Sequence, residues 1–200
     1  MPLVPQVTLH PFDKWVMGFV GPIKPPGKRT GARYIITVTN YLTRWEEDAL
    51  VVDCNATTTT RFLFDNIVTR FGCPRLLMSD QGSHFINRIV STLTEELQIQ
   101  HKKSTLYHPQ ANGAMEAFNK ILEHALTKVC NANHKDWDLK IPIVLWEYHT
   151  TFKRLTGQRP FKLVYGKETV MPMEYIVPIL HIVAAIGMDD EATCGIVDTT

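Results

Sequence analysis

The sequence predicts an α/β domain built on a mixed β-sheet. The chain has 200 residues, which suits one domain with a substantial buried core. Its first quarter is rich in β-branched and aromatic residues between turn signals, which is typical of strands. Its later part repeats apolar residues at helical spacing. A sheet covered by helices explains both patterns.

Three segments near the amino end predict an antiparallel meander. Residues 15–23 mix aromatic and β-branched residues and end at Gly21-Pro22, and residues 33–39 contain the run Tyr-Ile-Ile-Thr-Val. Residues 24–31 hold two prolines and two glycines, so they form the turn between these strands. Residues 44–52 supply the third strand.

The remaining elements follow from the change of period. We expect helices over residues 57–71, 84–97, 110–131 and 137–151, the last kinked or started near Pro142, and short strands over 74–79 and 99–102. In the first of these helices, Thr57–Thr60 offers an N-cap and Gly72 a stop. From about Thr156 the chain is punctuated by proline and glycine.

The composition is that of an ordinary globular protein and does not suit a secreted or membrane-spanning one. The hydrophobic fraction of 44% and charged fraction of 20% are ordinary for a globular protein. The net charge of +1 gives no global support for nucleic-acid binding, so any DNA contact must rest on a local patch. There is no signal pattern and no long apolar run, so we expect an intracellular protein, nuclear or cytoplasmic, without a membrane span. The cysteines are expected to be reduced thiols; they are Cys54, Cys73, Cys130 and Cys194.

Two acidic residues stand in a context that suits metal chemistry. Asp80 ends an apolar strand and is followed by Gly82, so its side chain can emerge at a sheet edge. Glu116 lies one turn into a helix opened by Pro109 and Gly113. Carboxylates that converge in this way can hold the hard metal ions used in phosphoryl transfer. The spacing alone is weak, since most of the 20 acidic residues must simply be solvated.

Seven segments raise the specificity of this pattern. In chain order they are Pro-Phe-Asp-Lys-Trp (11–15), Phe-Val-Gly-Pro (19–22), Tyr-Leu-Thr-Arg-Trp (41–45), Arg-Phe-Gly-Cys-Pro (70–74), Met-Ser-Asp-Gln-Gly-Ser-His-Phe (78–85), Tyr-His-Pro-Gln-Ala-Asn-Gly-Ala-Met-Glu (107–116) and Pro-Phe-Lys-Leu-Val-Tyr-Gly-Lys (160–167). Together they resemble the integrase catalytic core of gypsy-type long-terminal-repeat retrotransposons, particularly plant ones. The resemblance covers about residues 3 to 180.

The resemblance implies a ribonuclease-H-like fold and a set of ligands. The implied organisation is an extended lead over 1–14, a catalytic-core-like domain over 15–166, and an extension over 167–200 partly outside the resemblance. The implied reaction is attack of water or a DNA 3′-hydroxyl on a DNA phosphodiester, with Mg²⁺ or Mn²⁺ as cofactor. The implied partners are DNA, as element ends and target, and other copies of the chain in a homo-oligomer.

The family holds its metal ions with two aspartates and a glutamate, and this chain matches only two of the three. Asp80 matches the second aspartate and Glu116 the glutamate, whereas Gly18 occupies the place of the first aspartate. Glycine has no side-chain oxygen, so we expect weakened metal binding and a loss of strand transfer by orders of magnitude. Asp13 lies an odd number of residues away, which reverses its facing, and Asn40 offers only a neutral oxygen.

Further residues near the glutamate are candidates for DNA contact: His108, Gln110, Asn112, Asn119 and Lys120. A loop-orienting role for His108 and an ion pair between Lys120 and Glu116, one turn apart, are the plain alternatives.

Whether the chain is an enzyme is left open by the sequence. The first hypothesis is a degraded core with residual nucleic-acid binding; the family's zinc module and carboxyl-terminal DNA-binding module are not visible, which suggests a fragment of an element. The second is an active enzyme in which Asn40 or a water completes the metal shell. The third is a domesticated nucleic-acid-binding or protein-interaction module without catalysis.

Overall fold

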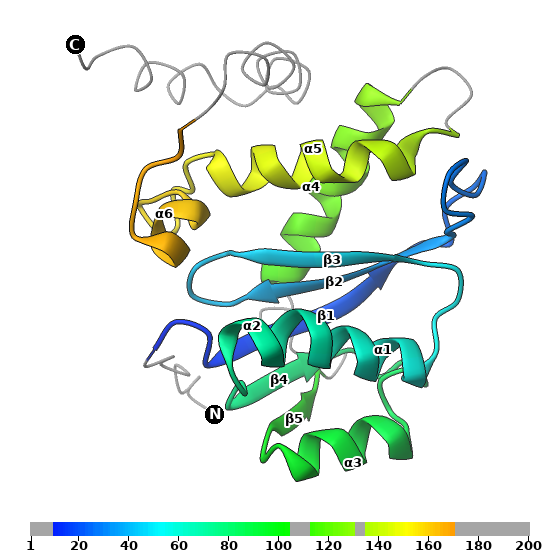
Figure 1. Ribbon diagram of the computed structural model, residues 1–200, viewed down its shortest axis with the longest axis vertical. Coiled ribbons are helices and arrows are strands. Elements are labelled where there is room, and N and C mark those ends of the chain that lie inside the picture. The colour runs from blue at the N-terminus through cyan, green and yellow to red at the C-terminus, as the bar shows by residue number, and fades with distance from the viewer. Residues whose placement is uncertain (1–9, 105–112, 131–134, 171–200) are drawn as a thin grey trace, which may run out of the picture.

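The computed structural model describes residues 10–104, 113–130 and 135–170. A five-stranded sheet forms the centre, with α1, α2 and α3 on one side and α4 and α5 on the other (Figure 1). In the described part of the chain, no helix is long and apolar enough to cross a membrane. The five-stranded sheet with helices on both sides confirms the predicted α/β architecture (Figure 1).

The sheet is mixed, as expected. Its strands are β1 (Lys14–Val20), β2 (Tyr34–Asn40), β3 (Glu46–Val51), β4 (Leu76–Ser79) and β5 (Gln100–Lys103), in the order β3-β2-β1-β4-β5. The first three strands form the predicted antiparallel meander. β4 runs parallel to β1, and β5 runs parallel to β4. β1 is thus the central strand, flanked by one antiparallel and one parallel neighbour.

The helices largely follow the predicted pattern. They are α1 (Ala56–Phe62), the π-helical η1 (Leu63–Val68), α2 (Thr69–Phe71), α3 (Arg88–Glu96), α4 (Gly113–Val129), α5 (Trp137–Thr150) and α6 (Pro160–Tyr165). The helix expected over 57–71 therefore runs through a π-helical segment. α3 begins later than expected because Asn87 caps it by accepting a hydrogen bond from Ile89 N (2.9 Å).

The predicted N-cap of α1 is wrong. Asn55, in an extended conformation, accepts a hydrogen bond from Thr58 N at 2.8 Å. The hydroxyls of Thr59 and Thr60 instead donate to carbonyl oxygens within and just before the helix. Asparagine is among the strongest N-cap residues, so it starts the helix before the threonine run. The predicted stop at Gly72 is confirmed, with φ of 85°.

Alternation along β1 divides the core into two layers. Trp15 and Met17 face the cluster under α1 and η1, whereas Val16 and Val20 face the side covered by α4 and α5. Gly18 shares the parity of Val16 and Val20, so it lies on the α4 side. Trp45 and Trp137 are buried in the core. Three of the four cysteines lie in the described residues, and all three are free thiols: Cys54, Cys73 and Cys130.

Candidate active site

The β1–β4 register brings two of the predicted site residues side by side. The pairs run from Lys14–Leu76 to Met17–Ser79, so Gly18 and Asp80 follow as the next neighbours. Residues paired in this way project to the same face of a sheet. Asp80 therefore emerges at the carboxyl end of β4, on the face that α4 covers.

α4 approaches this place through Met115. An ideal Cβ built on Gly18 would overlap the Sδ atom of Met115 and lie 2.9 Å from its Cε. Met115 is itself buried and packs against Val16 and Met78. The thioether thus fills the space into which a side chain at residue 18 would extend.

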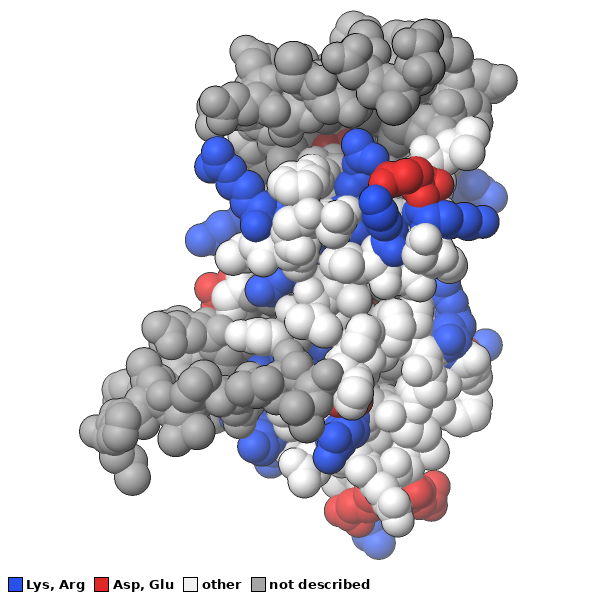
Figure 2. All heavy atoms as spheres, turned by 90° about the vertical axis from the view of Figure 1, so that its left-hand side faces the viewer, with Lys and Arg blue, Asp and Glu red and all other residues white. Residues whose placement is uncertain are grey.

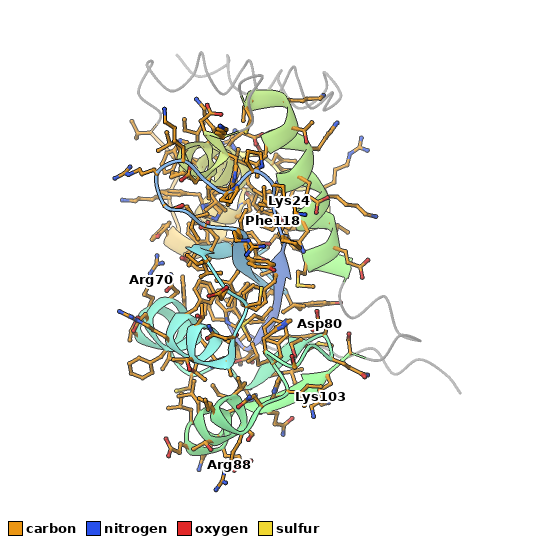
Figure 3. The ribbon with its side chains drawn as sticks, turned by 90° about the vertical axis from the view of Figure 1, so that its right-hand side faces the viewer. Lys24, Arg70, Asp80, Arg88, Lys103 and Phe118 are labelled. Atoms are coloured by element: carbon orange, nitrogen blue, oxygen red, sulfur yellow. The ribbon has the colours of Figure 1, made fainter. Side chains whose placement is uncertain are left out.

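A second contact places the next turn of α4 over β2. Thr37 pairs with Gly18 across the sheet, and its hydroxyl lies 3.4 Å from Asn119 Oδ1, to which it donates a hydrogen bond. Glu116 follows Met115 in the first turn of α4 and is exposed, as is Lys120. Figure 3 shows Asp80 near the amino-terminal end of this helix. Gly18, Asp80 and the first turn of α4 therefore gather at one end of the sheet.

The carboxylate of Asp80 is held by its own turn. Its Oδ1 accepts a hydrogen bond from Gly82 N at 2.7 Å, and the hydroxyl of Ser79 donates to its backbone oxygen at 2.9 Å. The side chain is half-exposed. One carboxylate oxygen is therefore occupied by the turn, while the group as a whole stays open to solvent.

His84 is a neighbour of Asp80 that the sequence reasoning did not single out. Its Nε2 lies 4.0 Å from Asp80 Oδ1, and its ring packs edge-on against Phe19 and Phe85. Burial lowers the pKa of His84, against the opposing effect of the Asp80 carboxylate. Within the described residues, Nε2 is buried without a hydrogen-bond partner. The available signal was its position four residues after Asp80 within the same motif.

The chain is similar to known proteins in sequence and in fold. Residues 9–109 match the family model described as "Integrase core domain". The chain belongs to this family. It is 25% identical over 172 residues to the Retrovirus-related Pol polyprotein from transposon 412 of Drosophila melanogaster, covering 86% of this chain and 14% of that protein. It is 30% identical over 166 residues to the Gag-Pol polyprotein of woolly monkey sarcoma virus, covering 82% and 9%. The integrase core thus spans a small share of these relatives.

Solved structures agree on the fold. The HTLV-2 integrase catalytic core domain, determined in complex with magnesium in a trimeric form, matches with a TM-score of 0.60 at 15% identity, over 78% of this chain and 97% of that one. The catalytic core domain of BIV integrase matches with a TM-score of 0.56 at 17% identity, over 76% and 93%. An intasome of simian T-cell lymphotropic virus with a PP2A regulatory subunit matches with a TM-score of 0.64 at 16% identity, over 82% and 58%. The predicted ribonuclease-H-like fold is confirmed.

The described side chains around Gly18 do not form a ligand set for a pair of magnesium ions. Across residues 10–104, 113–130 and 135–170, no three His, Cys, Asp or Glu side chains are grouped to hold a metal ion. At residue 18 the neighbouring side-chain atom is the Met115 sulfur, a soft donor that magnesium does not favour. Asp80 and Glu116 are the predicted ligands, and residue 18 is a glycine that offers no side-chain oxygen.

Asn40 and Asp13, the two residues considered from the sequence as replacement ligands, do not lie beside Gly18. Asn40 pairs with Trp15, three positions from Gly18 and on the opposite face of the sheet. Its Oδ1 accepts hydrogen bonds from Thr43 N, Thr43 Oγ1 and Leu42 N at 2.9, 3.0 and 3.2 Å. The structure therefore does not favour the alternative in which Asn40 completes a metal shell, because its oxygen accepts hydrogen bonds within the β2–β3 turn. Asp13 precedes β1 and lies 3.9 Å from the Arg75 guanidinium.

Three of the candidate DNA-contact residues, His108, Gln110 and Asn112, lie outside the described residues. The other two, Asn119 and Lys120, lie on α4 one turn beyond Met115 and Glu116.

Proposed function

We propose that the chain is the integrase catalytic core of a gypsy-type long-terminal-repeat element that keeps its fold and its affinity for DNA but lacks strand-transfer activity. The observation that carries this proposal is the packing of Met115 against Gly18. The proposal includes a core domain over 15–166, a lead over 1–14 and an extension over 167–200. The ordered motifs and the match to the transposon 412 polyprotein support the retrotransposon origin.

The loss of activity follows from charge and space. Two divalent ions about 3.5–4 Å apart on a scissile phosphate need several anionic oxygens around them. Asp80 and Glu116 would supply two charges against +4, and the Met115 side chain overlaps the Cβ position of residue 18, from which the third ligand would extend. We therefore expect Mg²⁺ or Mn²⁺ to bind weakly and singly.

DNA remains the proposed partner. The solved neighbour in an intasome supports a DNA-bound assembly, and the trimeric form of the HTLV-2 core supports a homo-oligomer. In this chain, Asn119 and Lys120 on α4 would contact DNA beside Asp80, together with His108, Gln110 and Asn112.

A DNA-nicking assay tests the proposal. The unmodified chain and the double variant Gly18→Asp/Met115→Ala are incubated with supercoiled plasmid and Mg²⁺ or Mn²⁺. We expect no nicking above background by the unmodified chain and metal-dependent nicking by the double variant. Robust nicking by the unmodified chain, abolished by Asp80→Asn, would refute the proposed loss of catalysis.

A domesticated module is the second candidate. The observation that favours it is that the space beside Gly18 is filled by a buried side chain, so the core is retained without its catalytic residue. DNA binding measured against salt distinguishes this candidate from an inert remnant, because phosphate contacts make affinity fall as salt rises.

A further inference from the structure

The charge of the chain is unevenly distributed. Residues 151–170 carry a single acid, Glu168, against five basic residues, Lys153, Arg154, Arg159, Lys162 and Lys167. This segment therefore has a formal charge of +4, and the rest of the chain has −3, since the whole has +1. A net charge of +1 for the whole chain is therefore compatible with a local basic patch in residues 151–170.

The basic residues are carried by an ordered segment. The turn after α5 is closed by a β-bridge between Lys153 and Gln158, and α6 follows directly. α6 is anchored by Phe161, whose ring lies 5.9 Å from that of Trp146 on α5. In Figure 2, basic side chains gather at the height of α6 on this face. Asp80 is labelled in the view from the other side, in Figure 3. The basic surface lies on the segment after α5, whereas the candidate active site is formed by β1, the end of β4 and the first turn of α4.

Not every cation in the segment belongs to the surface. Lys153 lies 3.5 Å from the centroid of the Tyr148 ring, and burial lowers its pKa to about 8, against the opposing effects of the Glu147 and Glu46 carboxylates. Lys153 therefore takes part in an internal cluster. We define the α6 basic surface as Arg154, Arg159, Lys162 and Lys167. Arg154 and Lys167 are exposed, and Arg159 and Lys162 are half-buried.

Glu168 occupies part of this surface. Its carboxylate accepts hydrogen bonds from Arg159 Nη1 at 2.9 Å and from Lys162 Nζ at 2.5 Å. The side chains of Arg159, Lys162 and Glu168 are 33%, 40% and 55% exposed. Ion pairs in contact with water are weak because solvent screens them. An incoming phosphate can therefore replace the Glu168 carboxylate at both cations.

We propose that the α6 basic surface is a second DNA-binding surface that contacts the phosphate backbone, with Glu168 as an internal competitor. This inference rests on the proposed function in requiring DNA as the partner. Guanidinium and ammonium groups spaced along an exposed segment match the closely spaced phosphates of a duplex, whose binding releases counterions. If Glu168 competes with DNA for these cations, removal of its carboxylate should strengthen DNA binding.

Exposed apolar side chains beside the surface define the rival occupants. Leu155 is 85% exposed and Phe152 is 47% exposed. These side chains would suit a second copy of the chain or a lipid surface. The charge excess favours DNA, and the experiment below separates the three.

The test measures binding of a fluorescent 20-base-pair duplex by the full chain between 50 and 200 mM salt. Glu168→Gln should tighten binding several-fold at low salt. Arg159→Gln/Lys162→Gln should weaken binding and reduce the slope of log affinity against log salt by roughly 2, about 0.9 for each lost phosphate contact. Glu95→Gln, an equal charge change at an exposed position of α3, is the matched control and should leave affinity unchanged.

Further arms separate the failure of this inference from that of the proposed function. Lys120→Gln reports on the candidate active site. If it reduces the salt slope while Arg159→Gln/Lys162→Gln does not, DNA meets only the α4 region, and the second surface is refuted while the proposed function stands. Absence of DNA binding by the unmodified chain refutes both. The surface is also refuted if Glu168→Gln increases self-association or binding to anionic vesicles but not binding to DNA.

Discussion

Met115 occupies the space into which any side chain at Gly18 would extend. The overlap involves the Sδ and Cε atoms of a side chain that is 7% exposed. The two positions are 97 residues apart in the sequence, and they meet because α4 crosses β1. Glycine at 18 and methionine at 115 therefore form one packing unit, and each should determine which residues the other position tolerates.

A double-mutant cycle tests this coupling. Met115→Ala should lower the free energy of unfolding by about 2–5 kcal/mol through the cavity that it leaves. Gly18→Ala should lower it by less, because the overlapping atoms are the far end of a flexible side chain that can shift. In the double variant the new methyl group fills part of the cavity, so the combined loss should fall short of the sum by about 0.5–3 kcal/mol. Urea denaturation measures all three; strictly additive losses would contradict the contact.

Asn40 should matter for stability and not for metal binding. It is buried, its Oδ1 accepts three hydrogen bonds in the β2–β3 turn, and its Nδ2 donates to Lys14 O at 3.2 Å. Asn40→Ala should therefore lower the free energy of unfolding by about 2–4 kcal/mol, since several buried groups lose their partner. Asn40→Asp adds a carboxylate at the same place. Increased Mg²⁺ affinity in Asn40→Asp would show that this side chain reaches the metal site after all.

Asp138, in the first turn of α5, accepts hydrogen bonds from the connection between β1 and β2. Its Oδ2 accepts hydrogen bonds from Arg29 N, Thr30 N and Thr30 Oγ1 at 2.9, 2.8 and 2.9 Å. Burial acts to raise the pKa of Asp138, but the hydrogen bonds from Thr30 and Arg29 outweigh it, so the pKa lies below its usual value of 3.8. Asp138→Ala should lower the free energy of unfolding by about 3 kcal/mol near neutral pH.

The pH dependence of this effect has a definite sign. A depressed folded-state pKa gives stability that is present above the unfolded-state pKa and is lost as pH falls through the folded-state pKa. The stability difference between the unmodified chain and Asp138→Asn should therefore shrink only below about pH 4. A difference that already declines between pH 7 and pH 5 would exclude the Asp138 carboxylate as its source.

His149 should make the fold sensitive to mild acid. Its ring stacks on Trp45 with centroids 3.7 Å apart, its Nε2 donates to Glu46 O at 3.0 Å, and burial lowers its pKa to about 4. The unfolded chain takes up the proton first, so the free energy of unfolding should fall between pH 6.5 and pH 4 and level off below. The full effect is about 3 kcal/mol.

His149→Phe keeps an aromatic ring on Trp45 and removes the titrating group. Burial raises the pKa of the neighbouring Glu46 well above its usual value, which opposes stability as pH rises and acts in both proteins. The difference between the two denaturation curves therefore isolates His149. If both proteins lose stability equally from pH 6.5 to pH 4, another group is responsible.

The spacing of apolar residues along the sequence predicted the strands and helices whose formation depends on neighbouring residues. The alternation in β1 and β2, the apolar run of β4 and the helical spacing of α4 needed no tertiary information, and neither did the absence of a carboxylate at residue 18. The Asn55 cap and the π-helical segment η1 depend on choices between near-equal local alternatives. The contact of Met115 with Gly18 joins segments far apart in the sequence, so no periodicity could indicate it. The place of His84 beside Asp80 is local, and its spacing of four residues was the available signal.

Metal titration shows whether Gly18 and Met115 together prevent the binding of two ions. Isothermal calorimetry with Mg²⁺ or Mn²⁺ compares the unmodified chain, Met115→Ala and Gly18→Asp/Met115→Ala. Only the double variant should bind two ions per chain, because it alone has both the carboxylate at residue 18 and the space for it. Two-ion binding by the unmodified chain, with the same affinity as the double variant, would contradict this prediction.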